Sequence, residues 1–446
     1  MSEHGTMESR TLMTRMTAMH RVRRFSKAAA FTLALTTGLA ACDLDSLLEV
    51  EPVDQVPADG LTTPQNARLL VNGAIADFEC AYGAYVALTG VLSGELMDAT
   101  STAARWDVDR RLFDAPSKEA QYATFGCTAL GVYTPLSTAR FSSENILQAL
   151  RGWTDAELAD LGHDRDELIA LAAAYNGYSY LLLAEGFCSA AIDLSEEKMP
   201  ADLFAVAVQR LEEAETAARA ANRTDLVNLA LVGQARAHRG LNNGAQAVAA
   251  AQQVEPGFRY DAETATDFSV RQNRIFASNG PQPLGGQGLS VGWLYHHYDH
   301  FGDPDPRVAV SDSIGLGPDQ TTPMFYQEKY TALDDPIRIA SYDEAQLIIA
   351  EFEGGATAEA IINDFHADAG LPPVDFSGMT AAQILEHVVE ERRSVLWLEG
   401  HRAEDVERFN LPQYPAPGTP HRKGQAYGDA RCFPLPDVEI RNNPNI

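Results

Sequence analysis

Apolar residues recur every three or four positions along much of the chain, the spacing that places them on one face of an α-helix. The clearest case is the segment 164–187, which has this spacing at Leu168, Leu171, Tyr175 and Leu182. Similar patterns predict helices over 65–92, 133–150, 202–221, 225–241, 245–254 and 380–399. Short polar joints separate the helices between 164 and 254, so this stretch is predicted to form alanine-rich helical pairs of the tetratricopeptide type.

Side-chain caps mark several predicted helix starts. In a capping box, a Ser or Thr and a Glu or Gln three residues later each bond the other's backbone N–H. Three pairs have this spacing: Thr154 with Glu157, Ser341 with Glu344, and Thr380 with Gln383. Helices are therefore expected to resume at Ser341, after the earlier ones have ended.

The segment 262–331 differs from the helical parts because Gly, Pro, Asn and Asp are frequent in it. Such residues favour loops and turns over helices. The chain is therefore predicted to be mainly α, with tetratricopeptide-like pairs followed by a loop-rich second half that contains a few short strands. The segment 341–446 should add C-terminal helices and an irregular tail.

The N-terminal segment has the layout of a lipoprotein signal. Four basic residues between 21 and 27 precede an apolar stretch, 28–38, and the run Leu39-Ala40-Ala41-Cys42 follows it. A basic region, a short apolar region and a small-residue cleavage site are typical of a signal peptide. We expect residues 1–41 to be removed and Cys42 to be lipidated, which would anchor the chain to a membrane. The alternative is an unmodified cysteine near an ordinary secretion signal.

Composition and proline spacing complete the domain plan. Three prolines in the acidic segment 42–64 predict an extended tether, and 65–446 should form a single domain. The formal net charge of −28 would repel nucleic acid and fits an uncharged or cationic ligand. Four cysteines follow the anchor, where disulfides can persist: Cys80, Cys127, Cys188 and Cys432. Four cysteines permit three complete pairings, and the sequence does not choose among them.

The densest aromatic stretch, 293–301, is the candidate ligand site. Aromatic faces pack against the C–H faces of sugar rings, so Trp293, Tyr295, His297 and Tyr298 are predicted to contact a glycan. The alternative is a strand whose rings are buried. A metal bound by the histidines of this stretch is not expected because the HExxH pattern of a helical zinc site is missing.

Catalytic and cofactor motifs are missing from the sequence. It contains no GxSxG nucleophile elbow, no GxxxxGK[ST] phosphate loop and no GxGxxG after a strand. We therefore predict a binding protein without a cofactor rather than an enzyme. The charge-rich segment 390–408, taken alone, predicts a solvated helix end with weak salt bridges.

A set of short motifs in the second half resembles the SusD/RagB family. In chain order they are Asp305-Pro306-Arg307, Lys329-Tyr330, Glu344 to Glu351, Glu391-Arg392-Arg393, Glu399-Gly400-His401-Arg402, Asp405-Val406-Glu407-Arg408 and Pro434-Leu435-Pro436. Val395 and Val406 depart from the Glu and Leu that are usual in the family. Together with the lipoprotein signal, the resemblance extends over the whole mature chain.

The resemblance implies a function for the chain. Members of this family are surface lipoproteins of the outer membrane that bind nutrients, mostly oligosaccharides, above a SusC-like TonB-dependent barrel. The matching motifs belong to the scaffold and do not identify the ligand, which could also be a peptide. Two other functions stay open at this point: a surface-displayed glycoside hydrolase and a tetratricopeptide-type peptide-binding scaffold.

Overall fold

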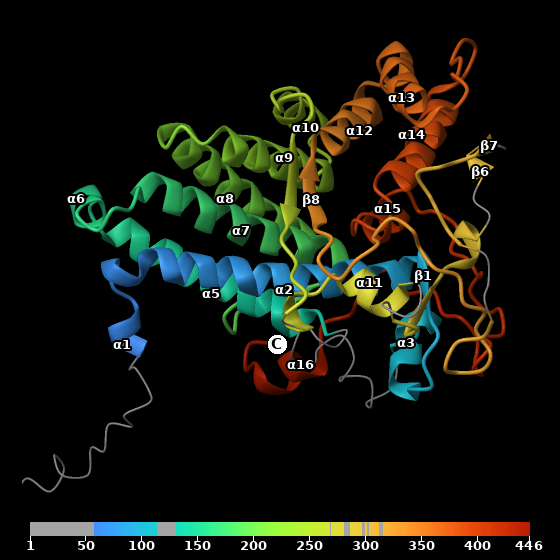
Figure 1. The fold of residues 1–446 in the computed structure, drawn as a ribbon, viewed down its shortest axis with the longest axis horizontal. Helices are drawn as coiled ribbons and strands as arrows, with labels where there is room; N and C mark the ends of the chain where they lie inside the picture. The colour runs from blue at the N-terminus through green and yellow to red at the C-terminus, as the bar shows by residue number, and fades with distance from the viewer. Residues whose placement is uncertain are drawn as a thin grey trace, which may run out of the picture. The chain divides into compact units, whose positions relative to one another are not determined.

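Helices dominate the computed structural model, which describes residues 58–113, 131–267, 269–280, 286–296, 299–300, 303–311 and 315–446 (Figure 1). These residues belong to one compact unit, Ala58–Ile446. The helices of its first half are α1 (Ala58–Leu61), α2 (Ala67–Ser93), α3 (Trp106–Arg110), α5 (Tyr133–Gly152), α6 (Asp155–Ala159), α7 (Arg165–Gly186), α8 (Pro200–Ala220), α9 (Thr224–Gly240) and α10 (Gly244–Ala251). Those of its second half are α11 (Arg274–Asn279), α12 (Tyr342–Glu353), α13 (Gly355–Ala369), α14 (Ala381–Val395), α15 (Arg402–Arg408) and α16 (Asp437–Asn442). The prediction of a mainly α fold is confirmed.

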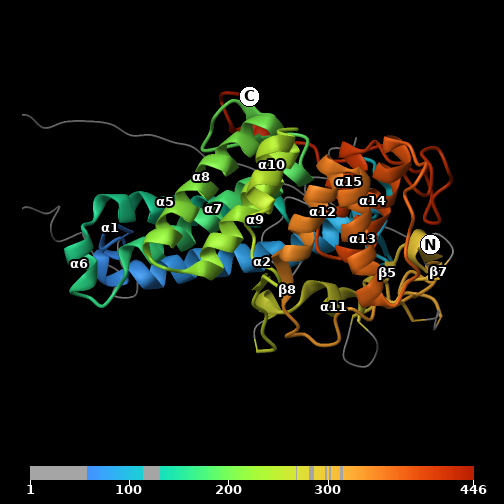
Figure 2. The same ribbon diagram turned by 90° about the horizontal axis from the view of Figure 1, so that it is seen from above.

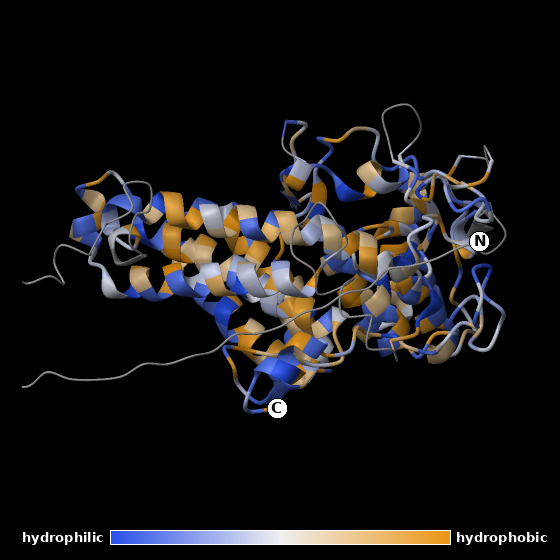
Figure 3. Cartoon of the chain, turned by 90° about the horizontal axis from the view of Figure 1, so that it is seen from below, coloured by the Kyte–Doolittle hydropathy of each residue, from blue (hydrophilic) through white to orange (hydrophobic). Residues whose placement is uncertain are grey.

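The helices α5, α7, α8, α9 and α10 pack in sequence order, each against the next (Figure 2). Glycines allow three of them to approach closely. A Cβ atom at Gly177 of α7 would lie 2.7 Å from the side chain of Leu211 in α8, and one at Gly233 of α9 would lie 2.8 Å from it. Apolar and polar residues alternate along these helices, as an amphipathic stack requires (Figure 3). The predicted tetratricopeptide-like pairs are present.

The long helix α2 lies in the core. Together with the 3-10 turn before it (Pro64–Asn66), it is long and apolar enough to cross a membrane, but 72% of its most apolar window is buried inside the structure. It packs against α5 and α7 and also against α11 and α15. We conclude that α2 is the core helix shared by the two halves of the unit.

The strands form four two-stranded antiparallel pairs within the described chain. They are β1 (Leu96–Asp98) with β5 (Leu289–Val291), β2 (Ala190–Ala191) with β3 (Glu197–Lys198), β4 (Arg259–Ala262) with β8 (Ile337–Ser341), and β6 (Asp299–His300) with β7 (Asp303–Pro304). The loop-rich half with a few short strands is therefore confirmed. The pairs β1–β5 and β4–β8 each join a strand of this half to an earlier one.

Several local predictions differ from the structure. The helical turns α1 and Pro64–Asn66 occupy the last residues of the predicted extended tether, 42–64. Helix α13 was not predicted, and the tail contains α16. The capping boxes at Thr154 and Thr380 are confirmed, whereas Ser341 caps the N–H of Glu344 without the reciprocal bond. Cys42 and the signal segment 1–41 lie outside the described residues.

Arg239 of α9 occupies the centre of a cluster of buried charges. Its guanidinium donates to Glu351 of α12 at 2.6 Å, to Asp405 of α15 at 2.6 Å and also to Glu404. Arg392 of α14 donates to the same Asp405 at 3.0 Å. The side chains of these residues are 1 to 4% exposed, apart from that of Glu404. Four helices therefore meet at one shared set of hydrogen-bonded charges.

A second buried arginine extends this cluster. Arg236, one turn before Arg239, donates to both carboxylate oxygens of Glu185 in α7 at 2.5 and 2.6 Å. Oε1 of Glu344 in α12 lies 3.7 Å from Nε of Arg236. Burial raises the pKa of Glu344 to about 7. Burial and the neighbouring arginines lower the pKa of His401, so its imidazole stays neutral. We call these residues, with those around Arg239, the buried ion network.

The network corrects the prediction for the segment 390–408. That segment was expected to be a solvated helix end, yet Arg392, Glu399 and Asp405 are buried. The predicted helix 380–399 ends at Val395, and a separate helix, α15, follows after a turn. The charges can be buried because each has a partner: Asp405 accepts from Arg239 of α9 and from Arg392, and Glu399 accepts from Lys329.

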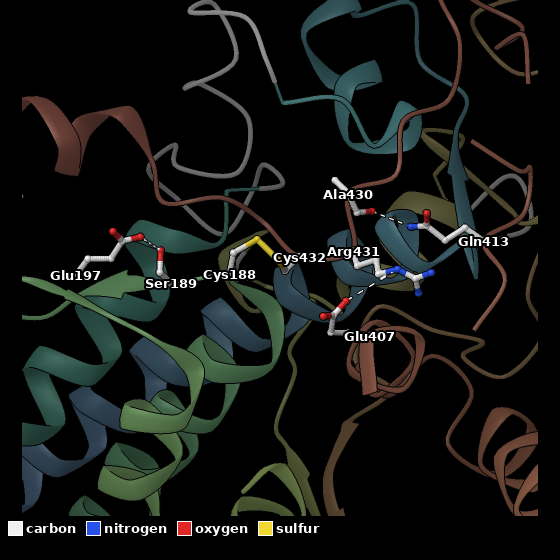
Figure 4. Close-up of a disulfide and its surroundings, with 8 residues drawn as sticks. All are labelled: Cys188, Ser189, Glu197, Glu407, Gln413, Ala430, Arg431 and Cys432. Atoms are coloured by element: carbon white, nitrogen blue, oxygen red, sulfur yellow. Dashed lines mark hydrogen bonds and ion pairs between the residues drawn. A yellow bond between two sulfur atoms is a disulfide. The ribbon is translucent and has the colours of Figure 1, made fainter. Parts of the chain in front are cut away.

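A disulfide joins the end of α7 to the C-terminal segment (Figure 4). Cys188 and Cys432 are bonded with their Cα atoms 5.2 Å apart and 244 positions apart in the chain. The backbone N–H of Cys188 also donates to the carbonyl of Phe433 at 2.8 Å. Two of the predicted disulfide cysteines are thus paired with each other; Cys80 is disulfide-bonded as well, and Cys127 lies outside the described residues.

The last residues of the chain are fixed by side-chain amides. Asn443 donates to the carbonyl of Ser195 at 2.7 Å, and Asn445 donates to that of Leu194 at 2.7 Å. Both acceptors belong to the turn between β2 and β3. These bonds attach the tail to the helical half after α16, and the disulfide at Cys432 attaches it before α16.

We predict that Arg239→Met lowers the free energy of unfolding by about 3 to 5 kcal/mol, because it leaves the buried carboxylates of Glu351 and Asp405, and the partly buried one of Glu404, without their shared cation. Urea unfolding followed by circular dichroism measures the change. The matched control is Arg219→Gln, since Arg219 is 52% exposed in its pair with Glu215. This control should change stability by less than about 0.5 kcal/mol. Equal effects of the two variants would show that the network adds no more than a surface pair.

Candidate functional site

The turn Trp293–Tyr295 presents an exposed indole next to a buried ring. It is a single 3-10 turn that follows β5. Trp293 is 40% exposed and Leu294 38% exposed, whereas Tyr295 is 1% exposed. Successive residues of a 3-10 turn point about 120° apart, so one turn can direct two side chains outward and one inward.

Gly292 allows this turn to sit directly on the core. Its N–H donates to the carbonyl of Glu95 at 2.7 Å, just beyond the pairing of β1 with β5. A Cβ atom at this position would lie 1.9 Å from the carbonyl oxygen of Gly94. Any other residue would push the turn away from α2, so Gly292 determines where Trp293 is placed.

Tyr295 anchors the turn from below. Its ring stacks on Trp397 with the ring centres 6.1 Å apart, and the guanidinium of Arg393 lies 4.4 Å from the centre of the Tyr295 ring. Arg393 also donates to the carbonyl of Leu294 at 2.6 Å. The structure therefore places Tyr295, a predicted ligand contact, in the core. For this residue it agrees with the alternative of a buried ring, although the backbone is a turn and not a strand.

The next residues of the aromatic stretch are only partly described. His296 stacks on Phe325 at 3.5 Å between ring centres, and its Nε2–H donates to the carbonyl of Val291 at 2.8 Å. His297 and Tyr298, both predicted ligand contacts, lie outside the described residues. Among the residues that the structure describes, no group of three or more His, Cys, Asp or Glu side chains could hold a metal ion.

Tyr414 is a second exposed aromatic residue at the site. It is 50% exposed and lines the same shallow hollow as Trp293. Arg111 holds the neighbouring backbone by donating to the carbonyl of Pro415, and its guanidinium lies 4.9 Å from the centre of the Tyr427 ring. Trp293, Leu294 and Tyr414 form what we call the aromatic patch. Tyr414 was not predicted from the sequence, although a tyrosine between Pro412 and Pro415 indicates an exposed loop.

A groove opens on the other side of the turn. It has a volume of about 490 Å³ and lies between Leu294 and the helices α14 and α15. The residues that line it are Leu294, Ala382, Leu385, Glu386, Val389, Glu390, Arg393, Arg402, Phe409, Leu411 and Pro412. We call it the α14–α15 groove. Leu294 therefore belongs both to the aromatic patch and to this groove.

A buried carboxyl group lies beneath the turn. Glu95 accepts the N–H of Leu398 at 3.2 Å, and its other oxygen has no hydrogen-bond partner in the described structure. Burial raises the pKa of Glu95 from 4.5 to about 7, against the opposing effects of the Leu398 N–H and of Arg402 and Lys329.

The aromatic patch as a whole presents flat aromatic faces on a fixed base. Such a surface is suited to stacking on the apolar face of a ligand ring.

Comparison with known proteins identifies the fold. No family model matches the chain, and no curated protein matches its sequence. Solved structures do match. A SusD superfamily protein from Bacteroides vulgatus shares 16% identity over 86% of this chain and 98% of its own, with a TM-score of 0.63. A SusD-like carbohydrate binding protein from the same species shares 15% identity over 86% and 97%, with a TM-score of 0.64. Surface glycan-binding protein A from Bacteroides fluxus shares 14% identity over 84% and 97%, with a TM-score of 0.61.

The chain has the SusD fold. The resemblance seen in the sequence motifs is thus confirmed for the fold, at a sequence identity too low to carry over a ligand. In this SusD-like chain, the buried ion network contains residues of four of those motifs: Glu344 and Glu351, Arg392, His401, and Asp405. These five residues therefore belong to the scaffold that supports the aromatic patch.

We predict that Glu95 makes the stability of this SusD-like unit pH-dependent. Burial favours the neutral acid, so the folded protein holds a proton that the unfolded chain releases between pH 4.5 and about 7. The contribution of Glu95 to stability is therefore lost as pH rises through this window. Unfolding free energies of Glu95→Gln and wild type should diverge, in favour of Gln, by on the order of 2 to 3 kcal/mol across it.

Urea unfolding at a series of pH values measures this difference. Glu344, whose pKa is also raised to about 7, titrates in both proteins and cancels. Glu386→Gln, on the exposed side of α14, provides the control for loss of a surface carboxyl group. A constant difference between Glu95→Gln and wild type across the window would contradict the prediction.

Proposed function

We propose that this protein is a surface lipoprotein of the outer membrane that binds an oligosaccharide and passes it to a SusC-like TonB-dependent barrel. The observation that carries the proposal is the aromatic patch on a SusD fold. Trp293 and Tyr414 are exposed, although the backbone next to each is fixed. The N–H of Gly292 donates to the carbonyl of Glu95, and Arg111 donates to the carbonyl of Pro415. Large aromatic side chains that stay exposed on a fixed base indicate a binding surface.

The comparisons support the ligand class. Two of the structures with this fold are named as a SusD-like carbohydrate binding protein and a surface glycan-binding protein. Sugar rings offer flat C–H faces, and the patch offers an indole and a phenol ring for them to stack on. The ligand is released unchanged, because the proposed function needs binding and transfer but no covalent step.

The anchor and the barrel complete the proposal. Lipid attached to Cys42 would hold the domain at the membrane through the tether, and the barrel would accept the ligand from it. The formal net charge of −28 agrees with a ligand that is not nucleic acid. The tetratricopeptide-like helices offer a surface for the barrel, whereas the aromatic patch lies in the loop-rich half.

We predict that Trp293→Ala and Tyr414→Ala each weaken glycan binding at least about tenfold, because each removes an exposed ring at the centre of the site. A glycan array identifies a ligand, and titration calorimetry then compares the variants. The control is Phe141→Ala, which removes a 51% exposed ring from α5. Wild-type affinity in both patch variants would exclude the patch as the site, and hydrolysis of array glycans would favour the glycoside hydrolase.

We predict that Cys42→Ala releases the protein from the membrane, because the acyl chains supply its membrane affinity. Incorporation of radiolabelled palmitate and membrane fractionation measure the change, with Trp293→Ala as a control that should fractionate like wild type.

The anchored protein should also co-purify with an outer-membrane barrel. Palmitate incorporation without any co-purified barrel would leave the anchor in place but contradict the transfer step.

A further inference from the structure

Arg402 has no hydrogen-bond or ion-pair partner among the described residues, although the protein has many acidic groups. It is the first residue of α15, and its side chain lines the α14–α15 groove, although its motif, Glu399-Gly400-His401-Arg402, was expected to belong to the scaffold alone. Within the described part of the chain, its guanidinium donates no hydrogen bond and forms no ion pair, and its Nη1 atom is buried. Arg393, on the same groove wall, donates through its two Nη atoms to Glu390 at 2.8 Å and to the carbonyl of Leu294 at 2.6 Å.

The carboxyl groups of Asp405 and Glu95, whose charged forms Arg402 stabilises electrostatically, already accept other hydrogen bonds. Asp405 accepts hydrogen bonds from Arg392 at 3.0 Å and from Arg239 at 2.6 Å. Glu95 accepts the N–H of Leu398, and because its pKa is about 7 it carries only part of a negative charge near neutral pH. The positive charge of Arg402 is therefore not fully compensated by the residues that the structure describes.

The shape of the groove restricts what can compensate it. Its walls are mostly apolar, formed by Leu385, Val389, Phe409, Leu411 and Pro412, and its volume is about 490 Å³. Apolar walls with one unpaired cation fit a ligand that has a carbon face and an anionic group. An arginine can bind a carboxylate through two parallel hydrogen bonds, which gives both affinity and orientation.

One acidic residue of the groove, Glu386, lies away from the end that contains Arg393 and Arg402. Glu386 precedes Arg393 by seven residues on α14, which places it about 10 Å away along the helix axis. A carboxylate would therefore be attracted to the Arg402 end and repelled from the Glu386 end. The groove is polarised along its length.

We propose that the α14–α15 groove binds a uronic acid unit of the oligosaccharide, with Arg402 as the cation for its carboxylate. The proposal rests on the proposed function, because Leu294 links the groove to the aromatic patch. A glycan that stacks on Trp293 and extends past the adjacent Leu294 would enter the groove. The ligand class is then an acidic oligosaccharide, which the negative charge of the protein would otherwise disfavour.

The test uses two forms of one sugar chain, tetragalacturonate and its methyl ester, which differ in charge but not in ring structure. Titration calorimetry at low salt should show that the full-length lipoprotein binds the free acid about tenfold tighter than the ester. Arg402→Gln should abolish this preference and leave the affinity for the ester unchanged. Arg402→Lys should keep part of it, and added salt should reduce it.

Two further variants separate the groove from the rest of the site. Glu386→Gln should bind the free acid at least as tightly as wild type, and the remote Arg219→Gln should behave like wild type. Trp293→Ala should weaken both forms equally. Thermal unfolding checks that Arg402→Gln is folded; if it is not, Arg402→Lys and Glu386→Gln carry the comparison.

The outcomes distinguish the two proposals. Equal binding of acid and ester by wild type, or a preference that survives Arg402→Gln, overturns the uronic acid site and leaves the glycan-binding function standing. If neither tetragalacturonate nor its methyl ester binds while neutral glycans bind on the array, the uronic acid site is likewise overturned and the glycan-binding function stands. Failure of every glycan to bind overturns the proposed function, and the uronic acid site with it.

Discussion

The bonds between Arg239 and the carboxylates of α12 and α15 are the interaction on which the rest of the unit depends. They attach the C-terminal helices to the tetratricopeptide-like stack. Removing charges from water is costly, so such a cluster is favourable only when every member is paired with good geometry. A small displacement of any of the helices would leave a buried charge unpaired. We infer that the network specifies the arrangement of these helices more than it adds to their stability.

The binding surface is connected to this network through α14. Arg392 faces inward and holds Asp405, and Arg393, the next residue, faces the turn and holds Tyr295 and the carbonyl of Leu294. Consecutive helical residues point about 100° apart, which allows one helix to serve both contacts. The position of Trp293 is therefore determined by the core on one side and by the close contact of Gly292 with Gly94 on the other.

The sequence predicted the helices better than the surroundings of single side chains. The helix predicted over 164–187 matches α7, Arg165–Gly186, because its apolar spacing is regular and Asp164 caps it. Burial of Arg392 could not be predicted, because a charge-rich segment has the same composition whether it is solvated or, as here, folded so that Arg392 bonds Asp405 in the core. Trp293 and Tyr295 look equivalent in the sequence, and only the turn and the contact with Trp397 separate them. Tyr414 comes to the patch from more than a hundred residues away.

The attachment of the C-terminal tail has a consequence for the survival of the protein. Cys432 is bonded to α7, and Asn443 and Asn445 hold the final residues against the turn between β2 and β3. A protease needs a loose segment of chain that it can draw into its active site. The stretch from Cys432 to Asn445 is attached at several points, so we expect proteolysis of the folded unit to begin elsewhere.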